Sequence, residues 1–140
     1  MLAQERGAEL ESPGRDGKGM VLHIQTVSID AAEPLSLAGF WAAVLGWGHR
    51  VDDDGDVWVE PDPGHSDHGR SVPLLFIRVD DPKSVKNRLH LDLVPEDQEE
   101  EVARVVALGA TRPSIGQTGH ESWVVLADPE GNEFCILGEP

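Results

Sequence analysis

Basic residues are scarce in this sequence: 11 Lys and Arg stand against 26 Asp and Glu, which leaves a formal net charge of −15. Binding to a nucleic-acid backbone needs clustered Lys and Arg, so this balance argues against a nucleic-acid partner. Long apolar runs are also missing, since none approaches the roughly 18 residues of a membrane span. We therefore expect neither a nucleic-acid nor a membrane partner.

Cysteine is almost absent as well. The single Cys135 excludes an internal disulfide and is compatible with the reducing cytoplasm, where we expect the protein to reside. The sequence has no Gly-rich phosphate loop, no Gly-x-Ser-x-Gly elbow and no paired-Cys metal motif. These absences argue against nucleotide-binding, serine-hydrolase and zinc-finger functions.

The length of 140 residues suits one compact domain, or one domain built from two similar halves. Residues 1–19 are rich in Gly, Glu and Arg and show almost no apolar periodicity. We interpret them as a disordered leader. The folded domain is then expected over residues 20–140.

The first half of this domain predicts a strand, a helix and three further strands. Apolar residues recur at helical spacing from Leu35 to Leu45, and Gly46 follows where a left-handed terminal residue is expected. An acidic turn around Gly55 separates two short β-rich runs, which is typical of a hairpin. The expected strands are residues 20–29, 49–51, 56–60 and 74–79.

The second half repeats this order of elements. A helix is predicted to begin at Pro95 and to end before Gly109, and Asp128-Pro129-Glu130-Gly131-Asn132 predicts a turn. Residue offsets between the halves are 109 − 46 = 63 for the helix-ending glycines, 123 − 58 = 65 for Trp123 and Trp58, and 90 − 23 = 67 for His90 and His23. The expected strands are residues 87–93, 111–115, 122–127 and 133–137.

We interpret this pattern as an internal duplication with repeats at about residues 20–81 and 86–138. The fold class is then α+β, with two βαβββ repeats that form a cupped mixed sheet. Each repeat has one helix to cover one face of its sheet, which leaves the other face for a cup. We expect His23 and His90 to point into this cup from equivalent first strands.

The segment 87–93 alternates strictly and therefore predicts a strand. Leu89, Leu91 and Leu93 form its apolar row and are expected to be covered. The opposite row consists of Arg88, His90 and Asp92, and it either faces water or lines a polar cavity. Because the predicted cup would enclose this row, we expect these side chains to line a polar cavity.

Three motifs, with their order and spacing, resemble the glyoxalase-like branch of the vicinal oxygen chelate superfamily. They are Phe40-Trp41-Ala42-Ala43-Val44-Leu45-Gly46-Trp47, the segment 86–93, and Asp128-Pro129-Glu130-Gly131-Asn132-Glu133-Phe134-Cys135. This superfamily includes glyoxalase I, extradiol dioxygenases and the bleomycin- and fosfomycin-resistance proteins. The resemblance covers residues 20–138 and implies a glyoxalase/bleomycin-resistance-like fold.

The resemblance also implies metal ligands on the first strand of each repeat and on the last strand. His23 and His90 match the first-strand positions, and Cys135 stands where the family has a Glu, three places after Asn132. A thiolate is a softer ligand than a carboxylate and favours zinc or copper. The sequence is therefore compatible with one divalent metal ion held by His23, His90 and Cys135, or with none.

Several side chains are candidates for substrate binding. Arg88 could bind an anionic group and Asp92 could orient His90, although the two could equally pair with one another. The lysines that precede Arg88, Lys83 and Lys86, form a basic cluster with it, which could be an anion-binding rim or a solvated loop. The expected lining of the cup is completed by Trp58, Trp123, Phe76 and Arg78.

Two functions remain open. In the first, the protein is a glyoxalase-like enzyme with metal-assisted lyase or isomerase chemistry, in which His23 and His90 hold the metal or transfer a proton. In the second, it is a non-catalytic small-molecule or drug-binding protein that resembles bleomycin-resistance proteins. A purely regulatory module is a third possibility. Exposed sheet edges favour a homodimer, and the resemblance implies one as well, since members of the family often dimerise.

Overall fold

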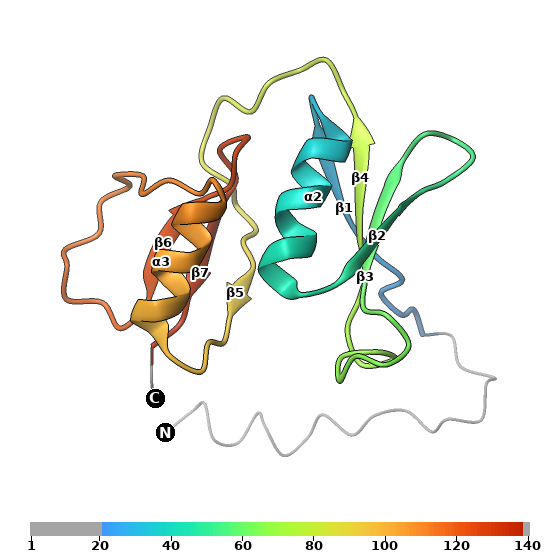
Figure 1. Ribbon diagram of the computed structural model, residues 1–140. Coiled ribbons are helices and arrows are strands. Elements are labelled where there is room, and N and C mark those ends of the chain that lie inside the picture. The colour runs from blue at the N-terminus through green and yellow to red at the C-terminus, as the bar shows by residue number, and fades with distance from the viewer. Residues whose placement is uncertain (1–20, 139–140) are drawn as a thin grey trace.

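A computed structural model describes residues 21–138, so the leader predicted for residues 1–19 lies outside the described residues (Figure 1). The chain forms two halves with a similar order of elements. The first half contains β1 (Val27–Ala31), α2 (Pro34–Leu45), β2 (Gly48–Val51), β3 (Val57–Glu60) and β4 (Leu74–Arg78). The second contains β5 (Asp92–Leu93), α3 (Gln98–Leu108), β6 (Val124–Ala127) and β7 (Glu133–Ile136). The predicted α+β class is confirmed.

Each half has its own sheet. The first sheet has the strand order β1-β4-β3-β2, in which β1 is parallel to β4 and the other pairs are antiparallel. The second sheet has the order β5-β7-β6, with Asp92 opposite Cys135 in the parallel β5–β7 pair. The strand predicted at residues 111–115 is reduced to one bridge between Thr111 and Ala127, so the second half lacks one strand of the predicted repeat.

The two helices follow local signals in the sequence. Gly46 ends α2 with a left-handed φ of 68°, and its N–H donates to the carbonyl of Ala42, as the glycine position predicted. Helix α3 begins at Gln98 rather than at Pro95, because the Asp97 side chain accepts the N–H of Glu100 and caps the helix there. Among residues 21–138, neither helix is long and apolar enough to cross a membrane.

Helix α2 lies between the two sheets (Figure 1). Its Trp41 packs against Phe134 of β7 with ring centroids 4.8 Å apart, and Phe40 lies 6.4 Å from the same ring. The helix-facing sides of both sheets therefore share one hydrophobic core. The opposite face of each sheet is left for solvent, a ligand or a partner.

The first strand of each half is shorter than predicted. Residues 21–26 precede β1 without regular structure, and β5 keeps only two of the seven residues expected in its strand. A strand extends only as far as its neighbour offers hydrogen bonds, and the bonds from β7 begin where Cys135 N–H donates to Leu91 O. Leu89 is 89% exposed, so the prediction that it is covered is wrong, whereas Leu91 and Leu93 pack against the core.

Candidate functional site

A cavity of about 350 Å³ lies on the face of the second sheet opposite the core. Its apolar lining comes mainly from β6, β7 and the residues beside them. Three charged side chains and one imidazole complete it. The lining residues are Lys86, His90, Asp92, Ile115, Trp123, Val125, Glu133, Cys135 and Leu137.

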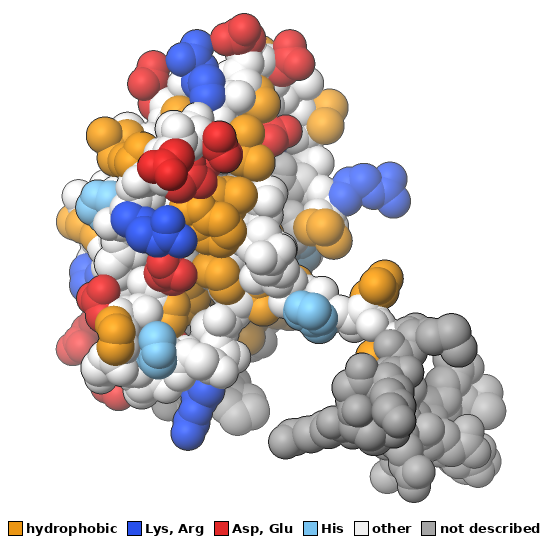
Figure 2. Space-filling view, turned by 90° about the vertical axis from the view of Figure 1, so that its right-hand side faces the viewer, with side chains coloured by type: hydrophobic (Ala, Val, Ile, Leu, Met, Phe, Trp, Pro, Cys, Tyr) orange, Lys and Arg blue, Asp and Glu red, His pale blue; other side chains and the backbone are white. Residues whose placement is uncertain are grey.

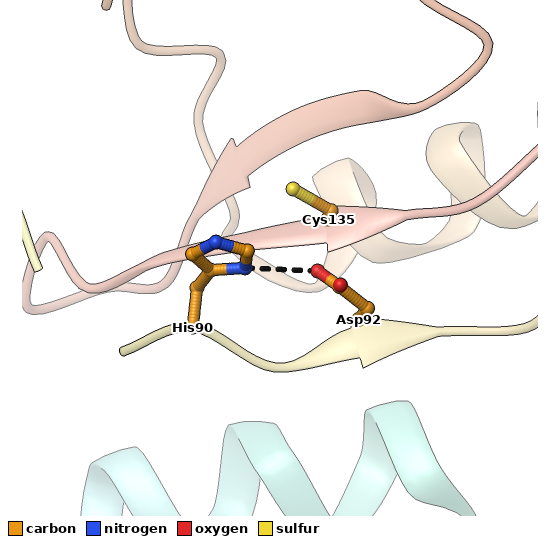
Figure 3. Close-up of side chains that lie close together, drawn as sticks. All are labelled: His90, Asp92 and Cys135. Atoms are coloured by element: carbon orange, nitrogen blue, oxygen red, sulfur yellow. Dashed lines mark hydrogen bonds and ion pairs between the residues drawn. The ribbon is translucent and has the colours of Figure 1, made fainter. Parts of the chain in front are cut away.

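Strand alternation brings three reactive side chains together in this cavity. Leu93 and Ile136 point into the core, so Asp92 and Cys135, one residue earlier on the same strands, point the other way. His90 precedes β5, and its Nδ1 lies 2.9 Å from Asp92 Oδ1. Figure 3 shows these side chains on the side of the sheet turned away from α2. The result is a compact His-Asp-Cys group on one surface.

The surroundings of Cys135 favour the thiol over the thiolate. Its side chain is buried, with 8% of the residue exposed. Burial raises the pKa of the thiol, and the charge and hydrogen bond of Asp92 raise it further, while the charge of Lys86 opposes them. A nucleophilic role for Cys135 alone is therefore not supported by its surroundings.

The donor atoms of this group fit a zinc ion. His90, Asp92 and Cys135 each offer one ligand atom, and these three atoms lie within 4.8 Å of one another. Donors bound at about 2.0 to 2.3 Å to a tetrahedral zinc are roughly 3.3 to 3.8 Å apart, so small side-chain shifts are sufficient. A nitrogen, oxygen and sulfur set suits zinc better than a hard ion such as manganese. Three protein ligands would leave a fourth position open.

Glu133 is a second carboxylate in the lining, and its negative charge is already paired with a lysine. Its Oε1 lies 2.9 Å from Lys83 Nζ, and its Oε2 accepts the N–H of Asn87 at 3.0 Å. Burial pushes the pKa of Glu133 upward, but the Asn87 N–H and the Lys83 ammonium outweigh it, and the pKa falls below its usual value. Glu133 is therefore ionised and structurally engaged.

The structure does not bring His23 to the other predicted ligands. His23 is exposed in the segment before β1 and is not among the clustered donors of residues 21–138. The helices that follow the first strands begin at Pro34 and Gln98, an offset of 98 − 34 = 64. With this offset the counterpart of His90 is Thr26, which corrects the pairing of His90 with His23.

Three other predicted residues lie away from the cavity. Phe76 is fully buried in the core, which corrects its assignment to a ligand-facing surface. Arg78 is exposed and forms an ion pair with Asp80 at 3.1 Å. Arg88 is also exposed and does not line the cavity, where Lys86 supplies the positive charge instead.

Trp58 lies on the outer face of the first sheet, apart from Trp123. Its indole N–H donates to Asp52 Oδ2 at 2.9 Å, and the Arg50 guanidinium lies 5.3 Å from the ring centroid. Figure 2 looks onto the side of the molecule that lies to the right in Figure 1, where hydrophobic side chains gather among charged ones. Leu75 and Ile77 of β4 lie on the same face of the sheet as Trp58 and are half-buried. The lining residues of the second-sheet cavity do not include these three.

Ile115, Val125, Glu133 and Leu137 were not among the predicted site residues. Alternation on the last strand could have identified Glu133 and Leu137, since both share the parity of Cys135. Ile115 comes from a loop, and no sequence signal points to it. Its position depends on how the segment 112–122 folds over the sheet.

A larger cavity, of about 560 Å³, lies between the two halves. It is lined by core-side residues such as Leu45, Leu74 and Val105, with Asp67 and Glu101 also present. None of the predicted site residues lines it. The smaller cavity holds His90, Trp123 and Cys135 and is therefore the candidate functional site.

Comparison with solved structures shows the same fold. A glyoxalase/bleomycin resistance protein/dioxygenase family enzyme from Burkholderia phytofirmans aligns over 84% of this chain and 98% of its own, with 18% identity and a TM-score of 0.61. A fosfomycin resistance protein from Listeria monocytogenes, solved with Mn(II) and dihydroxypropylphosphonic acid, covers 86% and 93% with 12% identity and a TM-score of 0.63. An antibiotic binding protein from a Streptomyces species covers 87% and 99% with 19% identity and a TM-score of 0.58.

The sequence itself matches the glyoxalase-like domain family over residues 26–137. No curated protein matches it. The family match spans most of the described chain and includes all three motifs that carried the resemblance. The chain therefore belongs to the glyoxalase-like domain family, within the vicinal oxygen chelate superfamily.

Proposed function

We propose that this protein binds a small, mainly apolar molecule in the cavity on the second sheet. The observation that carries the proposal is the cavity itself. Its volume of about 350 Å³ lies within the usual range of ligand sites, and apolar side chains surround a small polar group. Trp123 is 45% exposed, so its indole face is available to stack on a planar ligand.

His90 and Asp92 give this cavity a directional polar contact. With the proton on Nδ1, His90 donates to Asp92, and Nε2 is left to accept a hydrogen bond from a bound molecule. Asp92 thus orients the imidazole. One end of the ligand would then meet polar groups, and the rest would lie against Trp123 and Val125.

Calorimetric titration with 2-naphthol, a neutral planar probe, tests the proposal. We expect saturable binding that Trp123→Ala weakens by about fivefold, because a stacked aromatic contact contributes on the order of 1 kcal/mol. Val51→Ala is the matched control, since Val51 is an exposed apolar residue of the first sheet. Binding that is absent, or unchanged in Trp123→Ala, would contradict the proposal.

A second candidate function is metal-assisted lyase or isomerase chemistry, which the clustering of His90, Asp92 and Cys135 within 4.8 Å favours. These residues would hold a zinc ion, which when bound would polarise substrate oxygens as a Lewis acid. Their part is to position the ion and to keep one coordination site open. Glu133 and Lys83 would hold the adjoining wall in place.

Metal analysis of protein purified without chelator tests this candidate. We expect one zinc per chain, and Co(II) substitution should add a sulfur-to-cobalt charge-transfer band that Cys135→Ser abolishes. His90→Ala should release the metal, whereas His49→Ala, which changes an exposed histidine on β2, should not. Metal-free protein that also fails to take up zinc or cobalt would exclude the candidate.

We also propose that the protein is a homodimer in which a second copy covers the cavity. The outer faces of both sheets are open, and α2 occupies the space between them within one chain. Sedimentation velocity should give a dimer, and Ile77→Lys on the outer face of β4 should shift it to monomer. Ala107→Lys, on the exposed side of α3, is the control. A wild-type monomer at all concentrations would refute the proposal.

A further inference from the structure

We propose that the cavity selects one- or two-ring aromatic molecules that carry a negative charge, and that Lys86 binds this charge. The inference depends on the proposed function, because it names the class of ligand for the same cavity. Three features of the lining support it.

The first feature is that both carboxylates of the lining already have partners. Glu133 is bonded to the Lys83 ammonium and to the N–H of Asn87. Asp92 is bonded to His90 at 2.9 Å. The charge of Glu133 is compensated by the Lys83 ammonium, whereas Asp92 has a hydrogen-bond donor in His90 and keeps its negative charge.

The second feature is that Lys86 has no such partner. Among residues 21–138, its Nζ donates only to the carbonyl of Asn87, at 3.2 Å, and forms no ion pair. Of the basic residues in 21–138 that form no ion pair, Lys86 is the one that lines this cavity. Lys86 lines the same cavity as Cys135 and Val125. An anionic ligand group would supply the missing counterion.

The third feature is the apolar remainder of the lining. Ile115, Trp123, Val125 and Leu137 surround the space not bordered by charged groups. A volume of about 350 Å³ accommodates one or two fused rings with room for a carboxylate or sulfonate. The ring system would lie against Trp123 while its acidic substituent meets Lys86.

A matched pair of probes tests this inference: 2-naphthoate and 2-naphthamide have the same rings and differ in charge. At neutral pH we expect naphthoate to bind about five- to tenfold more tightly than naphthamide, as a charge-assisted contact to Lys86 implies. Lys86→Met should remove this preference and leave naphthamide binding unchanged, while Lys86→Arg should keep it. Arg70→Met is the control, because it changes the net charge equally at an exposed loop outside the cavity.

The outcomes separate the inference from the proposed function. Equal binding of both probes by the wild type, or a preference that persists in Lys86→Met, overturns the role of Lys86 but leaves small-molecule binding intact. Loss of the preference in Arg70→Met as well would show a general charge effect and also overturns it. If neither probe binds, or Trp123→Ala changes neither, the proposed function fails and this inference fails with it.

Discussion

Glu130 and Arg104 hold the two ends of α2, although both residues belong to the second half of the chain. The Glu130 carboxylate accepts the N–H groups of Ala32 and Glu33, at 2.7 and 3.0 Å, where the helix begins. The Arg104 guanidinium donates to carbonyls of the last helical turn. Each charge has the sign that complements the helix dipole at its end. Helix α2 is therefore completed by the half that follows it.

Removing the carboxylate of Glu130 should destabilise the protein. We expect Glu130→Ala to lower the free energy of unfolding by about 1 kcal/mol, because two backbone N–H groups just before the helix lose their charged acceptor. Glu130→Gln should recover part of this, because one amide oxygen can still accept. Urea denaturation measures the difference, with Glu96→Ala, at an exposed acidic residue, as the control. Equal stability of Glu130→Ala and Glu96→Ala would argue against this role of Glu130.

Arg104 should matter for its hydrogen bonds more than for its charge. It donates to the carbonyls of Ala43 and Val44 at 3.1 and 2.9 Å and pairs with Glu101 at 2.7 Å. Arg104→Met should therefore cost about 1 to 2 kcal/mol of unfolding free energy, and Arg104→Lys somewhat less. Thermal and urea denaturation provide the measurement. Arg112→Met, at another exposed arginine, should be neutral; a matching loss there would contradict the geometry.

The buried carboxylate of Asp128 should be among the most sensitive positions. Asp128 is 2% exposed and accepts the indole N–H of Trp41 at 3.0 Å, together with the backbone N–H groups of Glu130 and Asn132. Asp128→Asn replaces one acceptor by a donor and should cost about 2 to 4 kcal/mol. Asp53→Asn, at an exposed acidic residue, is the control. A near-neutral Asp128→Asn would show that the turn does not depend on this carboxylate.

Glu121 should titrate at unusually low pH. The N–H of Thr118 donates to its carboxylate at 2.7 Å and that of Gly119 at 2.9 Å, and such contacts lower the pKa of Glu121 from 4.5 to about 2. A lowered pKa means that the stabilisation is present above pH 4.5 and is lost as the pH falls toward about 2. Carboxyl NMR titration would measure the midpoint. A midpoint near 4.5 would contradict the loop geometry.

The helices and turns could be predicted because their signals are local. Apolar spacing and Gly46 located α2, and the Asp-Pro-Glu-Gly-Asn sequence located the turn that Asp128 closes. A helix or a turn makes its hydrogen bonds among residues a few positions apart, so the residues that decide it are adjacent in the sequence. The start of α3 was misplaced by three residues because Asp97, not Pro95, provides the cap.

Strand extents could not be predicted in the same way. The alternating segment 87–93 has the correct parity, since His90 and Asp92 face the cavity and Leu91 and Leu93 face the core. Its length depends on the neighbouring strand, and β7 provides partners only at the end of the segment. A strand needs a partner from elsewhere in the chain, and alternation alone does not show where that partner begins.

The candidate site, too, was only partly predictable from the sequence. His90, Asp92, Trp123 and Cys135 were identified in advance, because motif spacing and parity place them on one face of the second sheet. The exclusion of His23 and Phe76 and the inclusion of Ile115 followed from the folded arrangement, which also places Lys86, and not Arg88, of the predicted basic cluster in the lining.

Family membership, the presence of both helices and the facing of residues 90–93 were thus encoded in the order and periodicity of residues, whereas the facing of β4 was not, since Phe76 lies in the core. The set of residues that line the cavity depends on packing between distant segments. Helix α2 lies between the two sheets, so the faces of the sheets opposite the core point outward. Side-chain periodicity specifies a direction relative to the local backbone. The position of that backbone in space depends on contacts between residues tens of positions apart, such as Trp41 with Phe134.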